Sequence, residues 1–546
     1  MTMQKTPLLM SRLMDRAAWI APDEEIVTRT ATGTHRLTYA ESARRTRKLA
    51  GALAAHGVRP GDRVASFMWN GYRHLEMYHA VPAMGAVLHT LNIRLSPRDL
   101  EYIINHAADR VIVIDADLLP LLEQLDGRMG CVERIVVCSE DGSFSTRFDN
   151  AIDYEEFIAG GDEDTAWPEL DENAPMGLCY TSGTTGNPKG VMYTNRSTYL
   201  HTISVSMTDV MGLSATDSLC EIVPMFHAMS WGLPFAANML GMKQVMPHRF
   251  MDAVSVLDLF AEEEVTISAG VPTIWQGVRA AIEAEPGRWN LEHLQRVTCG
   301  GSAPPLSLID WFWTELGVEM IQGWGMTETN PIASISRRVN KRADLKLSLD
   351  EQFANINKAG LALPGLDVKI VDDDFNTLPN DGEAFGQLLI RGPWIAAEYY
   401  NDPQPDKFHD GWLVTGDVAK IDQDQYIIIT DRAKDLIKSG GEWISSVDME
   451  NHIASLPAIA MAAVVAQPHP KWDERPVAVV VKNSDANISA EDIVAHCATT
   501  FAKWQLPDDV VFVDAIPLTS TGKMDKKTVR ARLQQDGYQL PDLRGA

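Results

Sequence analysis

Hydrophobic and polar positions along most of the chain follow two patterns, one typical of buried strands and one of helices. Short β-branched runs occur at residues 110–115, 134–139 and 266–270, whereas residues 308–316 have the spacing of a helix. Alternation of such strands with helices is typical of parallel sheets covered by helices. The pattern therefore predicts an α/β sandwich with largely parallel sheets.

The pattern changes between about residues 360 and 426. Strand-like runs there are short and are separated by turn residues, as at 363–365, 372–374 and 380–382. Pro, Gly, Asn and Asp at this spacing favour tight reversals of the chain. We expect a small antiparallel or β-barrel-like subdomain in this region.

A domain boundary is predicted near Thr430, Asp431 and Arg432. After it, residues 460–466 and 476–481 have the character of strands, and residues 490–501 that of a helix. This is a compact α+β pattern of its own. We therefore expect a large N-terminal domain at 1–431 and a small α+β C-terminal domain at 432–546, the latter mobile.

Length and charge narrow the classes of protein. A chain of 546 residues is too long for one compact core, which agrees with two or more domains. The chain has 48 Lys and Arg against 74 Asp and Glu, a formal charge of −26. Such a surface repels nucleic acid and anionic membranes, so neither is an expected partner. Any phosphorylated ligand must then meet local cations and backbone N–H groups.

The N-terminus lacks the continuous apolar stretch of a signal peptide, and the longest apolar runs, such as 458–466, are too short to span a membrane. The six cysteines are scattered, with no CxxC pair. This use of cysteine is typical of reduced thiols. We expect a cytoplasmic protein without stable membrane insertion.

The strongest local signal for chemistry is residues 180–190, YTSGTTGNPKG. The segment follows a strand-like run at 176–179 and contains three Gly, three Thr, one Ser and Lys189. Glycines allow the backbone to approach a polyanion, to which hydroxyl and N–H groups then donate hydrogen bonds. The pattern GxxxxGK[ST] is absent, so this is not a standard P-loop. A polar linker is the alternative, but a linker does not normally follow a buried strand directly.

These residues resemble the signature loop of the adenylate-forming superfamily, which includes acyl-CoA synthetases, luciferases and the adenylation domains of peptide synthetases. Further blocks follow in the order of that family, at 224–227 (PMFH), 300–304 (GGSAP), 322–329 (QGWGMTET), 415–417 (TGD), 431–441 (DRAKDLIKSGG) and 517–523 (PLTSTGK). The resemblance covers nearly the whole chain. It is strongest to the fatty-acyl-CoA synthetase branch, and within it to ligases acting on 3-methylmercaptopropionate.

The resemblance implies an ATP-dependent acid:CoA ligase with ATP, Mg²⁺ and coenzyme A as cofactors. The acid would be 3-methylmercaptopropionate or another short- to medium-chain carboxylic acid, and the enzyme would be a homodimer. Alternatives are a general medium- or long-chain fatty-acyl-CoA synthetase, an enzyme that loads a carrier protein, a luciferase-like oxygenase, and a non-catalytic acyl- or nucleotide-binding protein. A non-catalytic protein of that kind should lack Lys523 or Glu328, and both residues are present.

For the nucleotide, the resemblance implies that Trp324 stacks on adenine, that Asp417 accepts the ribose hydroxyls and that Arg432 adds a second sugar contact. Mg²⁺ would be held by Thr184 and Glu328, since a carboxylate, a hydroxyl and phosphates suit this hard ion. The full ATP-binding set is Thr181, Ser182, Gly183, Thr184, Thr185, Gly186, Lys189, Gly301, Ser302, Ala303, Trp324, Gly325, Met326, Asp417 and Arg432.

For catalysis, the resemblance implies that Lys523 bridges the acid and the α-phosphate during adenylation. A rotation about Lys434, with Asp435 beside it, would then withdraw Lys523 and bring in the residues that bind coenzyme A. The expected catalytic residues are Lys523, Glu328, Thr327, His227, Lys434 and Asp435, and those for coenzyme A are Lys438, Gly440, Gly441 and Glu442.

The acyl group is expected to lie among His227, Trp231, Gly301, Gly325 and Pro331. Amino-acid-adenylating relatives carry an Asp near position 227 to pair with the substrate ammonium, so His227 suits an uncharged acyl tail. Trp231 resembles a gate residue of the fatty-acyl branch, and fixed packing in the core is the alternative. A fixed Trp231 implies a short pocket.

Overall fold

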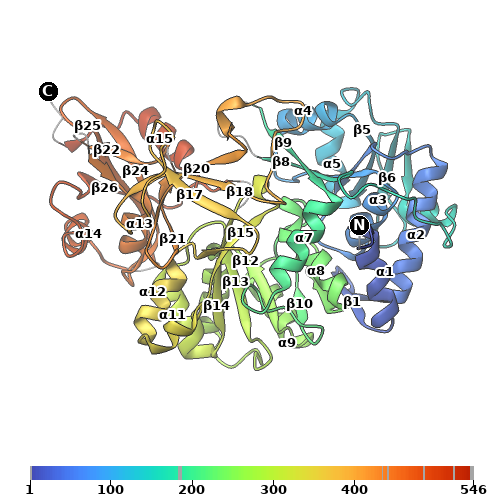
Figure 1. Cartoon of the computed structure of the whole chain (residues 1–546), viewed down its shortest axis with the longest axis horizontal. Coiled ribbons are helices and arrows are strands. Elements are labelled where there is room, and N and C mark those ends of the chain that lie inside the picture. The colour runs from blue at the N-terminus through green and yellow to red at the C-terminus, as the bar shows by residue number, and fades with distance from the viewer. Residues whose placement is uncertain are drawn as a thin grey trace.

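The computed structural model describes residues 3–181, 187–432, 434–439, 442–483, 486–519 and 523–541. These residues form four β-sheets with helices packed around them (Figure 1). The two large sheets come from the first part of the chain, and the two five-stranded sheets follow. Two kinds of sheet thus succeed each other along the sequence, as the change of pattern near residue 360 predicts.

The largest sheet has nine strands in the order β16-β15-β14-β13-β12-β10-β11-β1-β2. Its central pairs are parallel, and antiparallel strands complete both edges. The carboxyl ends of β12, β13 and β14 consequently meet at one edge of the sheet. The strands are β1 Glu25–Thr30, β2 Gly33–Thr38, β10 Ser218–Cys220, β11 Lys243–Met246, β12 Ile267–Gly270, β13 Arg296–Gly300, β14 Glu319–Gly325, β15 Ile332–Ser336 and β16 Leu361–Ala362.

The second large sheet has seven strands in the order β7-β6-β5-β3-β4-β8-β9. All pairs are parallel except β8 with β9, which flank the glycine-rich loop. The prediction of largely parallel sheets is confirmed. The strands are β3 Arg63–Phe67, β4 Val87–Thr90, β5 Asp109–Asp115, β6 Arg134–Cys138, β7 Ala151–Asp153, β8 Pro175–Thr181 and β9 Lys189–Thr194.

Helices cover these sheets, and one apolar core joins them. That core includes Ile26 of the first sheet, Val113 of the second and Leu53 of a helix between them. The helices are α1 Ser11–Ile20, α2 Tyr39–Ala55, α3 Tyr72–Ala83, α4 Pro97–Ala107, α5 Leu119–Leu122, α6 Tyr154–Ala159, α7 Asn195–Ser206, α8 Leu233–Leu240, α9 Ala253–Glu262, α10 Pro272–Ala284, α11 Leu306–Leu316 and α12 Leu349–Asn357.

The third sheet is antiparallel throughout, which confirms the predicted β-rich subdomain. Its order is β17-β18-β20-β19, with β21 paired to β20. The last strand reaches Arg432, so the predicted boundary falls at the end of this strand. The strands are β17 Asp367–Val371, β18 Phe385–Arg391, β19 Phe408–His409, β20 Trp412–Ile421 and β21 Ile427–Arg432.

The C-terminal sheet, β22–β26, lies with its helices at one end of the molecule, in orange and red in Figure 1. Its order is β23-β22-β25-β24, with β26 paired to β25. The elements are β22 Ile437–Ser439, β23 Glu442–Ile444, α13 Ser446–Ala454, β24 Ile459–His469, β25 Asp473–Lys482, α14 Ala490–Cys497, β26 Asp509–Phe512 and α15 Lys526–Gln535.

The predicted helix at 490–501 is too long. Helix α14 ends at Cys497, and the residues after it form turns. Thr499 donates its hydroxyl to the carbonyl of His496 at 2.7 Å. Thr side chains that bond to nearby carbonyls compete with the helical ladder, which explains the early end.

Two further findings concern the chain as a whole. In the ranges described, helices long and apolar enough to cross a membrane do not occur. Each of the six cysteines lies in those ranges and is free.

Candidate functional site

The candidate site lies where β13 and β14 end beside β20 and β21. Strand β13 ends at Gly300, and β14 carries Trp324 and Gly325 at its own end. Asp417 of β20 lies opposite Arg432 of β21 in the strand register. The site therefore lies between the carboxyl edge of the nine-stranded sheet and the antiparallel sheet. The strands that meet there are far apart in the sequence.

Asp417 is a buried carboxylate held from two sides. Its Oδ2 accepts a hydrogen bond from Trp324 Nε1 at 3.0 Å, and its Oδ1 is 3.3 Å from Arg432 Nε. The indole of Trp324 also packs against the apolar clusters of the antiparallel sheet. The carboxylate keeps lone pairs for further donors, because a carboxylate has about four acceptor positions.

Glu328 lies in the short turn that follows β14, and it is buried with 5% of its surface exposed. Its Oε1 accepts a hydrogen bond from the Tyr399 hydroxyl at 2.6 Å. The backbone is fixed as well, since Ala396 N donates to the Glu328 carbonyl at 2.8 Å and Tyr193 donates to the carbonyl of Thr327 at 2.7 Å. Glu328 is thus a rigidly placed acid.

The end of the glycine-rich loop reaches the same neighbourhood. Lys189 Nζ lies 5.1 Å from the centre of the Tyr399 ring and donates to Gln404 Oε1 at 2.8 Å. Tyr399 therefore connects Lys189 with Glu328. Thr181 ends β8, whereas Ser182, Gly183, Thr184, Thr185 and Gly186 lie outside the described residues.

Lys523 comes from the far end of the sequence and reaches Gly301. A Cβ atom placed on Gly301 would lie 3.2 Å from Lys523 Cε and 4.0 Å from its Nζ, and φ of Gly301 is +86°. The backbone conformation favours glycine here, and a larger side chain would press on the end of Lys523. Burial, with the nearby Arg432, lowers the pKa of Lys523 to about 8, against the attraction of Asp417 and Glu328. Predicted residues from five segments of the chain thus lie close together: Gly301, Trp324, Glu328, Asp417, Arg432 and Lys523.

His227 stands close to this lysine. Burial, together with the charges of Lys523 and Arg94, lowers its pKa to about 4. The imidazole is therefore neutral at pH 7. A neutral ring beside two cations can donate or accept a hydrogen bond without adding charge.

Arg94, Tyr399 and Gln404 were missed by the sequence analysis. Arg94 follows β4 at the carboxyl edge of the second sheet, and its burial lowers its pKa. A basic residue four positions after a buried strand is the one signal that would have indicated it. Tyr399 and Gln404 lie in a turn-rich stretch, where the sequence carries no sign of their contacts.

Trp231, one of the expected acyl-binding residues, packs against Gly300. Trp231 is 7% exposed and packs in an apolar cluster with Leu233 and Ile332. A Cβ atom on Gly300 would lie 2.7 Å from the Trp231 ring. The tip of the ring, at Cη2 and Cζ3, therefore packs against the end of β13.

The backbone around Trp231 is unusual. Ala228, Met229, Ser230 and Trp231 all have positive φ, between 43° and 56°, and Gly232 follows at 78°. This is a left-handed turn of five residues, which L-amino acids adopt at a cost of about 1 kcal/mol or more each. Nearby, a Cβ atom on Gly325 would lie 2.0 Å from the carbonyl oxygen of Pro331, so these two predicted residues are in contact.

The residues expected to bind coenzyme A lie in the C-terminal sheet. Lys438 is exposed on β22, and its N–H donates to Glu474 Oε2 at 2.9 Å. Gly440 and Gly441 lie outside the described residues, and Glu442 begins β23. Asp435 pairs with Arg530 of α15 at 2.8 Å, and burial lowers the pKa of Lys434.

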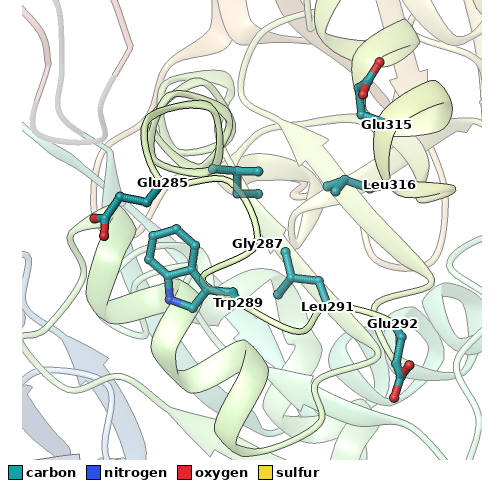
Figure 2. A pocket seen from close by; sticks show the side chains of 8 residues that line it. Glu285, Gly287, Trp289, Leu291, Glu292, Glu315 and Leu316 are labelled. Atoms are coloured by element: carbon teal, nitrogen blue, oxygen red, sulfur yellow. The ribbon is translucent and has the colours of Figure 1, made fainter.

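A surface pocket lies elsewhere, at the far ends of α10 and α11 (Figure 2). Its lining includes Trp289 and Leu291, and the carboxylates of Glu285, Glu292 and Glu315 point in different directions around it. Glu285 pairs with Arg288 at 2.8 Å, but the eight lining residues themselves include three carboxylates and no Lys or Arg, and this excess of negative charge would repel a triphosphate. This pocket is unsuited to the nucleotide.

Comparison with known proteins adds two matches to family profiles. Residues 14–400 match "AMP-binding enzyme", and residues 448–523 match "AMP-binding enzyme C-terminal domain". The second match ends at Lys523, the residue that reaches Gly301.

Curated relatives extend over nearly the whole chain. A 3-methylmercaptopropionyl-CoA ligase of Ruegeria pomeroyi is 43% identical over 97% of this chain and 98% of its own length. A long-chain-fatty-acid–CoA ligase of Thermus thermophilus is 44% identical over 97% of this chain and 96% of its own.

The fold is also that of a solved structure, an anthranilate CoA ligase in complex with anthranoyl-AMP. The TM-score is 0.87 at 24% identity, covering 98% of this chain and 100% of the other. The chain therefore belongs to the AMP-binding enzyme family, and it is an AMP-forming acyl-CoA ligase that binds ATP and uses coenzyme A.

Proposed function

We propose that this ligase converts ATP and a short- to medium-chain carboxylic acid into an acyl-adenylate and pyrophosphate, and then forms the acyl-CoA thioester with release of AMP. The acid that we propose first is 3-methylmercaptopropionate, which the name of the Ruegeria relative implies for that enzyme.

The position of Lys523 carries this proposal. A lysine from the last part of the chain lies against Gly301 and close to Asp417, Arg432 and Glu328. Adenylation brings a carboxylate against the α-phosphate of ATP, so two anions must approach each other. A cation between them stabilises the transition state more than the separate reactants. With a pKa of about 8, Lys523 is mostly protonated at pH 7 and can serve this role.

The nucleotide roles follow from the contacts of Asp417. Its carboxylate accepts the ribose hydroxyls while Trp324 and Arg432 keep it in place. Trp324 presents its ring to the adenine, and its N–H has the additional task of orienting Asp417. Lys189, beside Tyr399, supports the phosphates.

The buried carboxylate of Glu328 fits Mg²⁺. Groups of three or more His, Cys, Asp or Glu that could enclose a metal are absent from the described part of the chain, so an ion here needs oxygens from substrate and water. That is the usual coordination of Mg²⁺ at phosphates. Glu328 would hold the ion together with Thr184, and the ion would neutralise phosphate charge when bound.

For the second step we propose a rotation of residues 432–546 about Lys434. The turn there is tight, since Asp435 N and Leu436 N both donate to the carbonyl of Arg432, at 2.8 and 2.9 Å. Asp435 is tied to α15 through Arg530, so it moves with the C-terminal sheet. The rotation withdraws Lys523 and presents Lys438 and Glu442 to coenzyme A.

The packing of Trp231 supports a short acid. Its ring lies against Gly300 within an apolar cluster and so limits the space beyond the carboxylate. A long-chain substrate is the second candidate, because the Thermus relative is similar to the same extent.

Pyrophosphate release with graded acids tests both candidates. The assay compares 3-methylmercaptopropionate, butyrate, octanoate and palmitate, with and without coenzyme A. We expect the highest kcat/KM for pyrophosphate release with the short acids, and thioester only when coenzyme A is present. The highest kcat/KM with palmitate would favour the second candidate, and no release with any acid would refute the proposal.

A further inference from the structure

Arg475 of β25 is a buried cation, 9% exposed, whose guanidinium joins the end of β22 to the loop at 504–508. Nη1 donates to Ser439 Oγ at 2.8 Å and to the Trp504 carbonyl at 2.6 Å, and Nη2 donates to the Leu506 carbonyl at 3.1 Å. Asp508 receives two further bonds, from Nε at 2.8 Å and from Nη2 at 2.5 Å. All five bonds stay within the C-terminal sheet and its loops.

The bond to Ser439 matters because β22 is short and weakly attached. The strand has three residues, and its register with β25 consists of one pair, Ser439 with Asp473. The next two residues of β25 add side-chain bonds, from Arg475 to the Ser439 hydroxyl and from Lys438 N to Glu474. β22 also pairs with β23 over its three residues, so the side chains of β25 fix the position of this β22–β23 hairpin, with Lys438 and Ser439, on the rest of the sheet.

Arg475 cannot itself hold a phosphate of coenzyme A in this arrangement. Its charge is neutralised by a bidentate pair with Asp508, and all three of its nitrogen atoms are already bonded to protein. A buried guanidinium with this many acceptors fixes geometry. Arg475 can therefore influence the coenzyme A step only through the residues to which it is hydrogen-bonded.

We propose that Arg475 is a positioning residue for the coenzyme A step: it fixes the end of β22 and thereby the Lys438 that meets coenzyme A. The inference rests on the proposed function of Lys438. Loss of Arg475 should then affect thioester formation more than adenylation, because the segment that carries Lys523 is held by other bonds. Lys523 N donates to Thr519 Oγ1 at 3.1 Å, and Lys526 pairs with Glu450 at 2.7 Å.

The test measures the half-reactions separately in the full-length enzyme. Adenylation is followed by acid-dependent exchange of pyrophosphate into ATP, and the second step by thioester formation from supplied acyl-AMP and coenzyme A. Arg475→Met should lower the second rate about tenfold or more and raise the KM for coenzyme A, while adenylation changes less than about twofold. Arg475→Lys should recover part of the loss, because lysine keeps one bond to Asp508 but cannot reach all the acceptors.

Two further variants separate positioning from stability. Ser439→Ala removes one acceptor and leaves the pair with Asp508 intact, and we expect a loss of about threefold in the second step only. Lys482→Met is the matched control at the other end of β25, where Nζ donates to the Ile488 carbonyl at 2.7 Å. It should leave both rates unchanged.

The outcomes distinguish this inference from the proposed function. If the unmodified enzyme exchanges pyrophosphate but forms no thioester, the proposed function fails. If it forms thioester and both Arg475→Met and Ser439→Ala form it at the same rate, the positioning role alone is overturned. If Arg475→Met loses both steps through unfolding, Ser439→Ala decides, and an equal loss in its two steps would count against the inference.

Discussion

Two lysines of the C-terminal region are held in different ways. Lys523 lies against Gly301 of the nine-stranded sheet's edge, among carboxylates that belong to the large part of the molecule. Lys438 and Ser439 are bonded to Glu474 and Arg475 of their own sheet. Lys523 thus completes a site whose other residues belong to the large part of the molecule, whereas the position of Lys438 depends on residues of the C-terminal sheet itself. The difference suggests that each face can be altered without changing the other.

The largest effect is expected for Lys523→Ala. Removing the cation should lower adenylation by about 100-fold or more, because it leaves two approaching anions without compensation. Thioester formation from supplied acyl-AMP should be largely retained, since that step is assigned to the other face. Pyrophosphate exchange and single-turnover thioester formation measure the two. An equal fall in both rates would contradict the division.

The pH dependence of adenylation should follow the same lysine. Its pKa is lowered from 10.5 to about 8, so the ammonium is lost as the pH rises through about 8. We expect kcat/KM for ATP in the exchange reaction to fall about tenfold per pH unit above that value. In Lys523→Arg the remaining activity should not fall there, because a guanidinium stays charged. A fall at the same pH in both proteins would assign it to another group.

Asp417→Ala should raise the KM for ATP about tenfold. The change removes the proposed ribose acceptor and leaves Trp324 Nε1 and the Arg432 guanidinium without a carboxylate. Asp367→Asn is the control, because Asp367 forms an exposed pair with Arg391 in the same antiparallel sheet. Steady-state kinetics with varied ATP measure the effect. An unchanged KM for ATP in Asp417→Ala would contradict the proposed contact between Asp417 and the ribose.

Trp231→Ala should shift the acid preference toward longer chains, by about tenfold in the ratio of kcat/KM for octanoate and 3-methylmercaptopropionate. Truncation opens the space that the ring fills against Gly300. Trp289→Ala, in the distant pocket of Figure 2, should leave the ratio unchanged. No shift in Trp231→Ala would mean that other walls limit the acid.

The smallest effect is expected for Tyr399→Phe. The variant loses only the hydroxyl that donates to Glu328 at 2.6 Å. A less firmly placed carboxylate should raise the Mg²⁺ concentration for half-maximal exchange about threefold. Titration with Mg²⁺ at saturating ATP measures this, and an unchanged midpoint would place the ion away from Glu328.

The sequence was sufficient for the parts that depend on local pattern. The β-branched run at 110–115 became β5, and the turn-rich stretch after residue 360 became the antiparallel sheet. The approach of Lys523 to Gly301 was expected only through the resemblance of ordered motifs, since nothing local connects positions so far apart. The bonds of Tyr399 with Glu328 and of Arg475 with Ser439 were not predictable, because each depends on how separate strands come to lie together.

The left-handed turn at 228–232 restricts how this enzyme can be redesigned. Every residue in it has positive φ, a conformation that β-branched side chains adopt only under severe strain. Val, Ile or Thr at position 231 would disturb the backbone as well as the ring's volume, whereas Ala, Asn or Gly would change mainly the volume. Changes of substrate range through residues 228–232 are therefore limited to the few residue types that tolerate positive φ. Broader substitution is better directed to positions with ordinary backbone conformation.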